Sequence, residues 1–414
     1  MSAITPPRIM IAGKGKNGVA MTGMLSDINV LDLTTFLSGP YCTMILSDMG
    51  ACVTKIETPS KGCATRKNPP FINGESAYFM SLNRGKKSLT LNLKSEQGKK
   101  IFLQLAAGSD VLVENFRPGV MKRLGFDYEK ISGLNPKIIY ASLSGFGNSG
   151  PYKHKGAYDM VIQGYGGIMS ITGYPGGEPA RVGYSIADLS AGLYGALAIT
   201  GALHVRDKAG KGQYLDVSMF DCQVSMMENA IARYFATGTI PGPLGNRHPS
   251  IAPFQSFKST NGYFTVAAST DEQFVNLCDA VGLANVKSDK RFLSKPDRVK
   301  NVEYIIEIFQ KIFEEKPKEH WIELLERHDV PCGPINNVKE VVESPQVQAR
   351  EMIIAMDHRK AGKVKMVAPP IKASLTPLCV QCPSPLLGQD TESILSQIGY
   401  SREAIGSFKA NGVI

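Results

Sequence analysis

The spacing of apolar positions along the first 145 residues predicts strands separated by helices. Short apolar, β-branched runs lie at residues 28–33, 52–57, 88–93, 110–113 and 137–143. Segments between them carry apolar residues at helical spacing. Strand–helix–strand units of this kind form parallel sheets with right-handed crossovers. The pattern therefore predicts an α/β fold built on a Rossmann-like parallel sheet.

Local signals mark where the predicted helices begin and end. Ser38-Gly39-Pro40 follows the first strand, which predicts Ser38 as a helix cap and Pro40 near the first turn. Gly50 ends this helix and Ser95 caps a later one. No G-x-G-x-x-G motif follows the first strand, so the predicted sheet lacks the dinucleotide-binding fingerprint.

Beyond the predicted sheet, the chain passes through a Gly- and Pro-rich linker at Gly238–Pro253. A strand at Tyr263–Ala268, three helices and a turn at Val330–Pro334 follow. The last 60 or so residues show few strong elements before Thr391–Ile398, and we expect them to pack back on the first lobe. The predicted organisation is a flexible N-terminal extension at 1–26, a large lobe at 27–224, linkers and a smaller α+β lobe at 225–344, and a C-terminal return to the large lobe at 345–414.

Composition narrows the class of protein. Hydrophobic residues make up 43% of the chain and charged residues 20%, which is ordinary globular usage. No apolar run approaches the ~20 residues that a membrane crossing needs. The first 26 residues lack acidic side chains, but Pro6-Pro7 disfavours a transit helix and no apolar secretory region is present. We therefore predict a cytoplasmic protein without a membrane partner.

Charge and cysteine content exclude further classes. The net charge is +9, but Lys and Arg are spread along the chain without a basic stripe, so a nucleic-acid partner is not predicted. Binding of a phosphorylated ligand, or simply a solvated basic surface, explains the surplus of positive charge. The eight cysteines read as reduced thiols, and the Cys379-x-x-Cys382 pair lacks a second pair or a nearby His. No metal site is predicted.

Asp188 is the candidate reactive residue, at the point where a polar turn meets a long helix of small residues. A helix N-terminus offers free N–H groups and partial positive charge. These should keep the pKa of the carboxyl low and the group ionised, as a nucleophile requires. Aspartate is also a favoured helix cap, so this pattern alone leaves a capping and a catalytic role open.

Ordered motifs from about Asp27 to the C-terminus resemble the class III CoA-transferase family, which includes formyl-CoA transferase, carnitine CoA-transferase and α-methylacyl-CoA racemase. They include VLDLTTFLSGPYCTMILSDMGACVTKIE at 30–57, VENFRPG at 113–119, YDMVIQGYGG at 158–167, DLSAGLYGALAITGALHV at 188–205 and PLLGQDT at 385–391. The resemblance implies an enzyme that moves coenzyme A from an acyl-CoA to a carboxylic acid. Coenzyme A would then be a substrate and not a permanently bound cofactor.

The resemblance also implies roles for individual residues. Asp188 matches the family's catalytic aspartate, which attacks the thioester, forms a mixed anhydride and then carries CoA as a thioester. Backbone N–H groups of Gly166-Gly167 or of the loop at 245–249 are candidates for oxyanion stabilisation. Lys94 and Arg123 suit phosphate groups. The implied CoA contacts are Phe36, Arg66, Leu91, Lys94, Asn115, Phe116, Arg123, Leu124, Tyr158 and Met219.

Departures from the family pattern bear on the substrate. Thr35-Phe36-Leu37 stands where formyl-CoA transferase has polar residues, which argues against oxalate and for a larger or more apolar acid. We expect succinyl-CoA as donor and an arylsuccinate or other dicarboxylate as acceptor. Thr58-Pro59 replaces a basic residue, whose role we assign to Arg66.

Two alternatives remain open, and the quaternary structure is an expectation. A racemase needs a second acid–base group, but its histidine position holds Tyr158, and an ordinary tyrosine with a pKa of about 10 is a poor base. A non-catalytic subunit of a heteromeric transferase is disfavoured by the presence of Asp188. The resemblance implies a dimer of interlocked rings, formed by two copies of this chain or with a related subunit.

Overall fold

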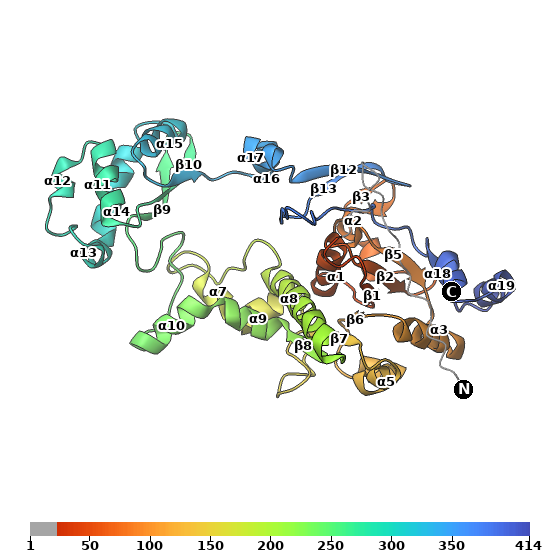
Figure 1. The fold of residues 1–414 in the computed structure, drawn as a ribbon. Helices are drawn as coiled ribbons and strands as arrows, with labels where there is room; N and C mark the ends of the chain where they lie inside the picture. The colour runs from red at the N-terminus through yellow and green to blue at the C-terminus, as the bar shows by residue number, and fades with distance from the viewer. Residues whose placement is uncertain (1–22) are drawn as a thin grey trace. The chain divides into compact units, whose positions relative to one another are not determined.

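The computed structural model describes residues 23–414, which form two compact units. The larger unit combines the described residues up to Ile168 with Val182–Ile231 and Gln346–Ile414, and the smaller combines Met169–Arg181 with Ala232–Pro345. The colour gradient in Figure 1 shows that red and blue segments, from opposite ends of the described chain, meet in the larger unit. Residues 1–22 of the predicted extension lie outside the described residues.

Six parallel strands form the sheet of the larger unit, in the order β5-β2-β1-β6-β7-β8. Their bounds are β1 (Asn29–Asp32), β2 (Cys52–Glu57), β5 (Lys87–Thr90), β6 (Val111–Glu114), β7 (Ile139–Ser144) and β8 (Tyr214–Ser218). The order reverses between β1 and β6, and open α/β sheets bind ligands at the carboxyl ends of the strands that flank such a reversal. The predicted parallel sheet is confirmed.

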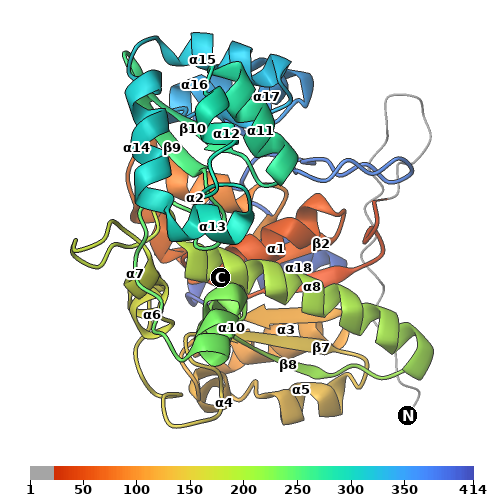
Figure 2. The same ribbon diagram turned by 90° about the vertical axis from the view of Figure 1, so that its left-hand side faces the viewer.

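Alternating side chains along each strand build a separate core on each face of the sheet. Val30 points into one core and its neighbour Leu31 into the other. The first core is covered by α1 (Ser38–Asp48), α8 (Ile186–Ala209) and α9 (Met219–Met226). The second is covered by α3 (Glu96–Ala107), α4 (Val120–Leu124), α5 (Tyr128–Leu134), α18 (Thr391–Gln397) and α19 (Arg402–Ala410). Helix α8 lies beside α1 in both views (Figures 1 and 2).

The C-terminal segment joins the large sheet through hydrogen bonds to β5. The Thr391 hydroxyl accepts the Thr90 backbone N–H at 3.0 Å, and the Asp390 carboxylate accepts that of Ser88 at 2.9 Å. Helix α18 accordingly lies beside β5 (Figure 1). The larger unit is thus built from both ends of the described chain, as predicted.

The smaller unit has a three-stranded antiparallel sheet of β9 (Phe254–Ser259), β10 (Gly262–Ala267) and β11 (Cys332–Pro334). Helices α11 (Asp271–Ala280), α14 (Val302–Phe313) and α15 (Lys318–Arg327) complete its aromatic core. The prediction of a simple turn at Val330–Pro334 was wrong, because part of it pairs with β10. Proline is tolerated there because β11 is an edge strand.

Other elements escaped the sequence pattern because they are short or exposed. Strand β8 lies at the edge of the large sheet with its first three residues at least partly exposed, and a hairpin forms at β12 (Ile353–His358) and β13 (Gly362–Val367). The remaining elements are η1 (Ala64–Lys67), β3 (Phe71–Ile72), β4 (Glu75–Ser76), α2 (Ala77–Asn83), α6 (Asp159–Tyr165), α7 (Ile168–Ile171), α10 (Glu228–Thr237), α12 (Ala284–Lys287), α13 (Lys295–Lys300), α16 (Val338–Glu343) and α17 (Pro345–Ala349).

Helix α8 is long and apolar enough to cross a membrane by length and composition, which the sequence analysis did not expect. Half of its most apolar 18-residue window is buried within the protein, and the core helix of a soluble protein meets the same criteria. The core that it shares with the large sheet accounts for its buried half, whereas Leu193, Leu197 and Val205 are exposed.

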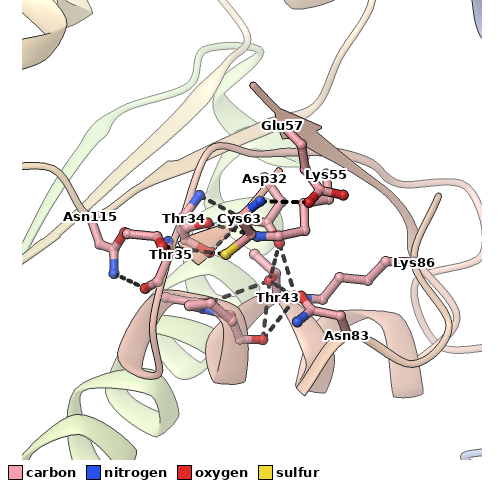
Figure 3. Close-up of polar contacts among 12 residues, drawn as sticks. Asp32, Thr34, Thr35, Thr43, Lys55, Glu57, Cys63, Asn83, Lys86 and Asn115 are labelled. Atoms are coloured by element: carbon pink, nitrogen blue, oxygen red, sulfur yellow. Dashed lines mark hydrogen bonds and ion pairs between the residues drawn. The ribbon is translucent and has the colours of Figure 1, made fainter. Parts of the chain in front are cut away.

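A buried ion-pair network lies at the carboxyl end of β1 (Figure 3). The Asp32 carboxylate is 3.0 Å from the Lys86 ammonium and 3.7 Å from that of Lys55, and all three side chains are 0% exposed. Burial opposes ionisation, but the two lysines and the hydroxyls of Thr34 and Thr43 hold the pKa of Asp32 far below its usual range. Burial lowers the pKa of Lys86 to about 8, against the opposing effect of Asp32.

The same two lysines also bind backbone carbonyls on either side of the junction between β1 and α1. Lys55 donates to the Thr34 carbonyl at 2.7 Å, and Lys86 donates to the Pro40 carbonyl at 3.0 Å (Figure 3). A buried ammonium needs all its donors satisfied. The network therefore fixes the path of the chain where β1 ends and α1 begins.

Close packing of α8 on α1 depends on Gly192. A Cβ atom at this position would lie 2.8 Å from the Ser38 carbonyl oxygen and 2.9 Å from the Tyr41 ring. Because one of these atoms belongs to the backbone, it cannot rotate away. Glycine thus allows the two helices to approach at this level.

We expect Asp32→Ala to lower the free energy of unfolding by about 3–5 kcal/mol, because it leaves two buried ammonium groups without their carboxylate. Urea denaturation followed by circular dichroism measures this. Glu96→Ala removes an exposed carboxylate paired with Lys99 and should leave the unfolding midpoint unchanged. Equal midpoints for the two variants would contradict a central structural role for the network.

We expect Gly192→Ala to destabilise the protein by about 1–3 kcal/mol, the usual cost of overpacking. Gly201→Ala is the matched control on the same helix, because nothing lies within 4 Å of its added Cβ. The control should stabilise by up to about 1 kcal/mol through helix propensity. Thermal unfolding of both variants tests the pair, and the same sign of change in both would contradict this account of the packing.

Candidate functional site

The loops after β1 and β6 are joined at the point where the strand order reverses. Asn115 accepts the Thr35 backbone N–H at 2.8 Å and donates to the Thr35 carbonyl at 2.8 Å (Figure 3). The next residue, Phe36, has a φ of 61°, which is uncommon for a residue with a side chain. The paired Asn115 and the buried network hold this turn on both sides.

An exposed aromatic pair borders this turn. The rings of Phe36 and Tyr158 meet edge-on, with centroids 5.8 Å apart, and the two residues are 40% and 63% exposed. Tyr158 directly precedes α6, whose first residue is Asp159. The pair thus presents apolar surface to solvent next to the carboxylates described below.

The first turn of α8 is capped by a carboxylate from another helix. Asp159 accepts the backbone N–H of Ala187 at 2.9 Å and, more weakly, that of Asp188 at 3.4 Å. Its other oxygen accepts the Gln163 amide at 2.6 Å. Ser185, the residue before α8, makes no capping bond of its own. Asp188 therefore does not cap the helix, and its side chain is directed elsewhere.

The Asp188 carboxylate contacts the start of α1. Ser38 is among the groups that influence its ionisation and lowers its pKa. The predicted cap at Ser38 was wrong: Ser38 is the first residue of α1, and Leu37 precedes it without a capping bond. The starts of α1 and α8 approach closely at this level, because Gly192 has no side chain to meet the Ser38 carbonyl.

The pKa of Asp188 is raised to about 6, contrary to the low value expected from a helix N-terminus. Burial is the largest cause, the negative charge of Asp159 adds to it, and Ser38 opposes both. The prediction was wrong because Asp159 takes the helix N–H groups and brings a second carboxylate. At neutral pH Asp188 is still mostly ionised, and its partial burial leaves the charge poorly solvated.

Tyr78 of α2 and Cys63 lie in the same negative environment. Burial, with the charges of Asp188, Cys63 and Asp159, raises the pKa of Tyr78 to about 12, so it remains a neutral phenol. The Cys63 sulfur is 3.3 Å from the Thr35 hydroxyl and 3.2 Å from that of Thr65. Burial opposes ionisation of this thiol, but Lys55 and these hydroxyls lower its pKa overall.

The residues singled out as CoA contacts have different surroundings. Phe36 and Asn115 belong to the loops at the strand reversal, and Tyr158 contacts Phe36. Lys94 and Arg123 are exposed, whereas Phe116 and Leu124 are partly buried against the second core. The side chains of Leu91 and Met219 are buried in the two cores, so only their backbone could reach a ligand.

Arg66 is engaged within the fold. Its guanidinium donates two bonds of 2.7 Å to the buried Glu57 carboxylate, and lies 3.7 Å from the centre of the Phe79 ring. A further bond of 3.1 Å reaches the Pro385 carbonyl. A bidentate pair of this kind neutralises the arginine and satisfies its donors. Arg66 thus anchors the segment after β2.

The backbone N–H groups of the three glycines considered for oxyanion stabilisation already have partners. That of Gly166 donates to Ile162 at 2.7 Å and that of Gly167 to Gly164 at 3.2 Å. In the smaller unit, the N–H of Gly245 donates to Gly173 at 2.7 Å. These glycines form turns, and the expectation that they supply free donors is not supported by the structure.

The sequence motifs did not single out two residues of this site, Tyr78 and Gln163, or reveal that Ser38 influences Asp188. Tyr78 belongs to no motif, and Gln163 was seen only as a letter in the motif at 158–167. Ser38 lies 150 positions before Asp188. No local pattern links them, because their contact depends on how α1 packs against α8.

Within residues 23–414, no group of three or more His, Cys, Asp or Glu side chains is placed to hold a metal ion. All eight cysteines are free thiols. The chemistry that this arrangement supports is that of a partly buried, ionised carboxylate, Asp188, with a second carboxylate nearby.

Known proteins resemble this chain over most of its length. The model of CoA-transferase family III matches residues 25–391. The chain is 42% identical to acetyl-CoA:oxalate CoA-transferase of Acetobacter aceti, covering 85% of this chain and 90% of that protein. It is 38% identical to succinyl-CoA:glutarate CoA-transferase of Homo sapiens, covering 94% and 90%.

The fold is also that of a solved structure. A CAIB/BAIF family protein from Brucella suis superposes with a TM-score of 0.80 at 37% identity, covering 90% of this chain and 98% of that one. Matches of this length and identity establish the family and its type of reaction. The chain belongs to CoA-transferase family III and is an enzyme that transfers coenzyme A.

Proposed function

We propose that Asp188 is the nucleophile of this transferase and carries coenzyme A between two carboxylic acids. The observation that supports this most directly is the Asp188 carboxylate itself, ionised but partly buried between the starts of α1 and α8. A carboxylate that is poorly solvated is more reactive toward a carbonyl than one in water. Asp159 accepts a backbone N–H at the start of α8, and Gln163 donates to Asp159. These bonds are consistent with both residues positioning the segment that carries Asp188.

The proposed reaction begins with an Asp188 oxygen attacking the thioester carbonyl of the donor. A carbon–oxygen bond forms, the carbon–sulfur bond breaks, and CoA leaves as the thiolate. The thiolate then attacks the Asp188 Cγ of the mixed anhydride and releases the donor acid. The acceptor carboxylate attacks the resulting aspartyl-CoA thioester, and the thiolate released in that step returns to the acceptor carbonyl. Asp188 is regenerated, and neither the anhydride nor the thioester is hydrolysed along the way.

We propose succinyl-CoA as the donor and a dicarboxylic acid as the acceptor. Relatives at 35–42% identity are named for oxalate, glutarate and mesaconate as acceptors, and several for succinyl-CoA as donor. The exposed Phe36–Tyr158 pair would suit an acceptor with an apolar carbon skeleton, such as an arylsuccinate. Two exposed cations, Lys94 and Arg123, are the proposed contacts for CoA phosphates, whereas Arg66 is proposed to be structural.

The cytoplasmic location and the interlocked dimer, formed with a second copy or a related subunit, stay predictions. They rest on composition and on the family resemblance respectively. The absence of a histidine at Tyr158 continues to disfavour a racemase, because an exposed tyrosine does not supply a second base near neutral pH.

We expect a covalent adduct on Asp188 when the protein is mixed with succinyl-CoA. Intact-protein mass spectrometry should show the mass of bound CoA, and hydroxylamine should convert the loaded carboxyl to a hydroxamate on the peptide containing Asp188. Asp188→Asn should abolish the adduct and lower transfer by several orders of magnitude while retaining CoA binding. An adduct on another residue, or full activity of the variant, would remove Asp188 from this role.

We expect the rate of adduct formation to fall below a pH of about 6, because Asp188 must be ionised to attack. The rate should drop about tenfold for each further pH unit. Asp159→Asn removes a neighbouring negative charge and should move this limb to lower pH in whatever activity remains. Stopped-flow measurement of the first half-reaction checks both, and a limb near pH 4 in the unmodified enzyme would contradict the raised pKa.

A further inference from the structure

A polar cavity of about 520 Å³ lies in the larger unit, on the side of the sheet that carries the second core. Its walls come from the end of β6, α4 and the segment before it, the start of α5, strands β7 and β8, and the loop at 148–154. Small-molecule sites occupy about 300–1,000 Å³, so this cavity is large enough for one. Neither Asp188 nor any residue implied as a contact for coenzyme A lines it. The cavity is therefore distinct from the site described above.

The wall at the end of β6 contains a buried carboxylate without a cation beside it. Glu114 is 6% exposed, and the Phe116 backbone N–H donates to it at 2.8 Å. Burial raises the pKa of Glu114 to about 7, although Ser142 and the bond from Phe116 oppose the rise.

Other buried carboxylates in residues 23–414 are paired with a lysine or an arginine. They are Asp32, Asp48, Glu57 and Asp110. Glu114 makes no such ion pair in this part of the chain and faces the cavity instead. Burying an unpaired charge is costly. A ligand that donates a hydrogen bond to Glu114 would reduce this cost.

Three tyrosine rings form an aromatic wall of the same cavity. Tyr140 and Tyr214 are paired residues of β7 and β8, and their ring centroids are 5.7 Å apart. The ring of Tyr128, in α5, lies 6.0 Å from that of Tyr140 and 5.5 Å from that of Tyr214. The buried Tyr140 is held by a bond of 3.1 Å to the Phe126 carbonyl, whereas Tyr214 is 36% exposed. Rings of this kind stack against flat heterocycles such as nucleobases.

Positive side chains surround the cavity as well. They are Arg117, Lys122, Lys153 and His154. None of the four makes an ion pair with another described residue, so their donors are available to an anion. Of the two acidic residues nearby, Asp127 caps α5 by accepting the Lys130 N–H at 3.1 Å, and Glu129 is exposed. Arginine and lysine are the residues that bind phosphate groups in proteins.

We propose that this cavity binds an adenine nucleotide. The amino group of the base would donate to Glu114, the ring would lie against Tyr128 and Tyr214, and the phosphates would meet the four positive side chains. Coenzyme A also contains an adenosine phosphate, so a free nucleotide and coenzyme A share this chemistry. The structure favours the free nucleotide, because the implied contacts for coenzyme A lie outside the cavity. The inference does not depend on the role proposed for Asp188.

The test is a calorimetric titration of ADP into enzyme whose own coenzyme A site has been filled with coenzyme A. We expect one ADP to bind per chain under these conditions. Inorganic pyrophosphate carries the phosphates without the base, and therefore leaves Glu114 and the tyrosines without a partner. It should bind at least about tenfold more weakly than ADP.

Two substitutions test the walls of the cavity separately. Glu114→Gln keeps the size of the side chain but removes the carboxylate, and should weaken ADP binding by about 10–100-fold. Tyr214→Ala removes an exposed ring and should weaken it by about tenfold. Tyr263→Ala, at an exposed tyrosine of the smaller unit, is the matched control and should leave ADP binding unchanged. The dissociation constant for coenzyme A should be the same in all three variants. Melting temperatures show which variants fold, and Tyr214→Ala carries the test alone if Glu114→Gln does not fold.

No ADP binding to the enzyme filled with coenzyme A would overturn the proposal. So would equal affinities for ADP and pyrophosphate, which indicate a simple anion site. Unchanged ADP affinity in the folded cavity variants would mean that the nucleotide binds elsewhere. An enzyme that binds ADP as expected but forms no adduct on Asp188 would support this site and contradict the proposed function, so the two failures are distinguishable.

Discussion

The buried pairing of Asp32 with Lys55 and Lys86 is the constraint on which the rest of this site depends. Three charges without solvent exposure persist only if their hydrogen bonds are complete. Lys55 also donates to the Thr34 carbonyl after β1, and Lys86 donates to the Pro40 carbonyl in the first turn of α1. The network thus fixes the path of the chain between β1 and α1, despite the free-energy cost of burying three charges. That path places Phe36 and Ser38 at the strand reversal.

Contacts between distant segments then bring the reactive carboxylate to that turn. Asn115 joins the loop after β6 to Thr35, and Gly192 lets α8 approach α1. Asp159, from α6, takes the N–H groups at the start of α8 that a local cap would otherwise hold. Asp188 is left in a setting that burial and a second carboxylate make poorly suited to charge.

This setting is consistent with what a carboxylate nucleophile requires. A pKa of about 6 leaves Asp188 ionised at neutral pH while raising the free energy of its charged form. Forming an anhydride or a thioester at this carboxyl removes the charge and relieves the repulsion from Asp159. The same surroundings that raise the pKa would therefore favour the covalent state on which CoA transfer depends.

The sequence by itself determined the parallel sheet, the order of its first strands along the chain and the family to which the protein belongs. The spacing of apolar residues and the order of the motifs are local properties of the chain, so both can be read without the structure. It did not reveal β8 or β11, since edge strands need few apolar residues. Only the tertiary structure decided that Arg66 pairs with Glu57, that Asp159 caps α8 and that the pKa of Asp188 rises. Each of these depends on burial and on a partner, and both are set by packing between segments far apart in the chain.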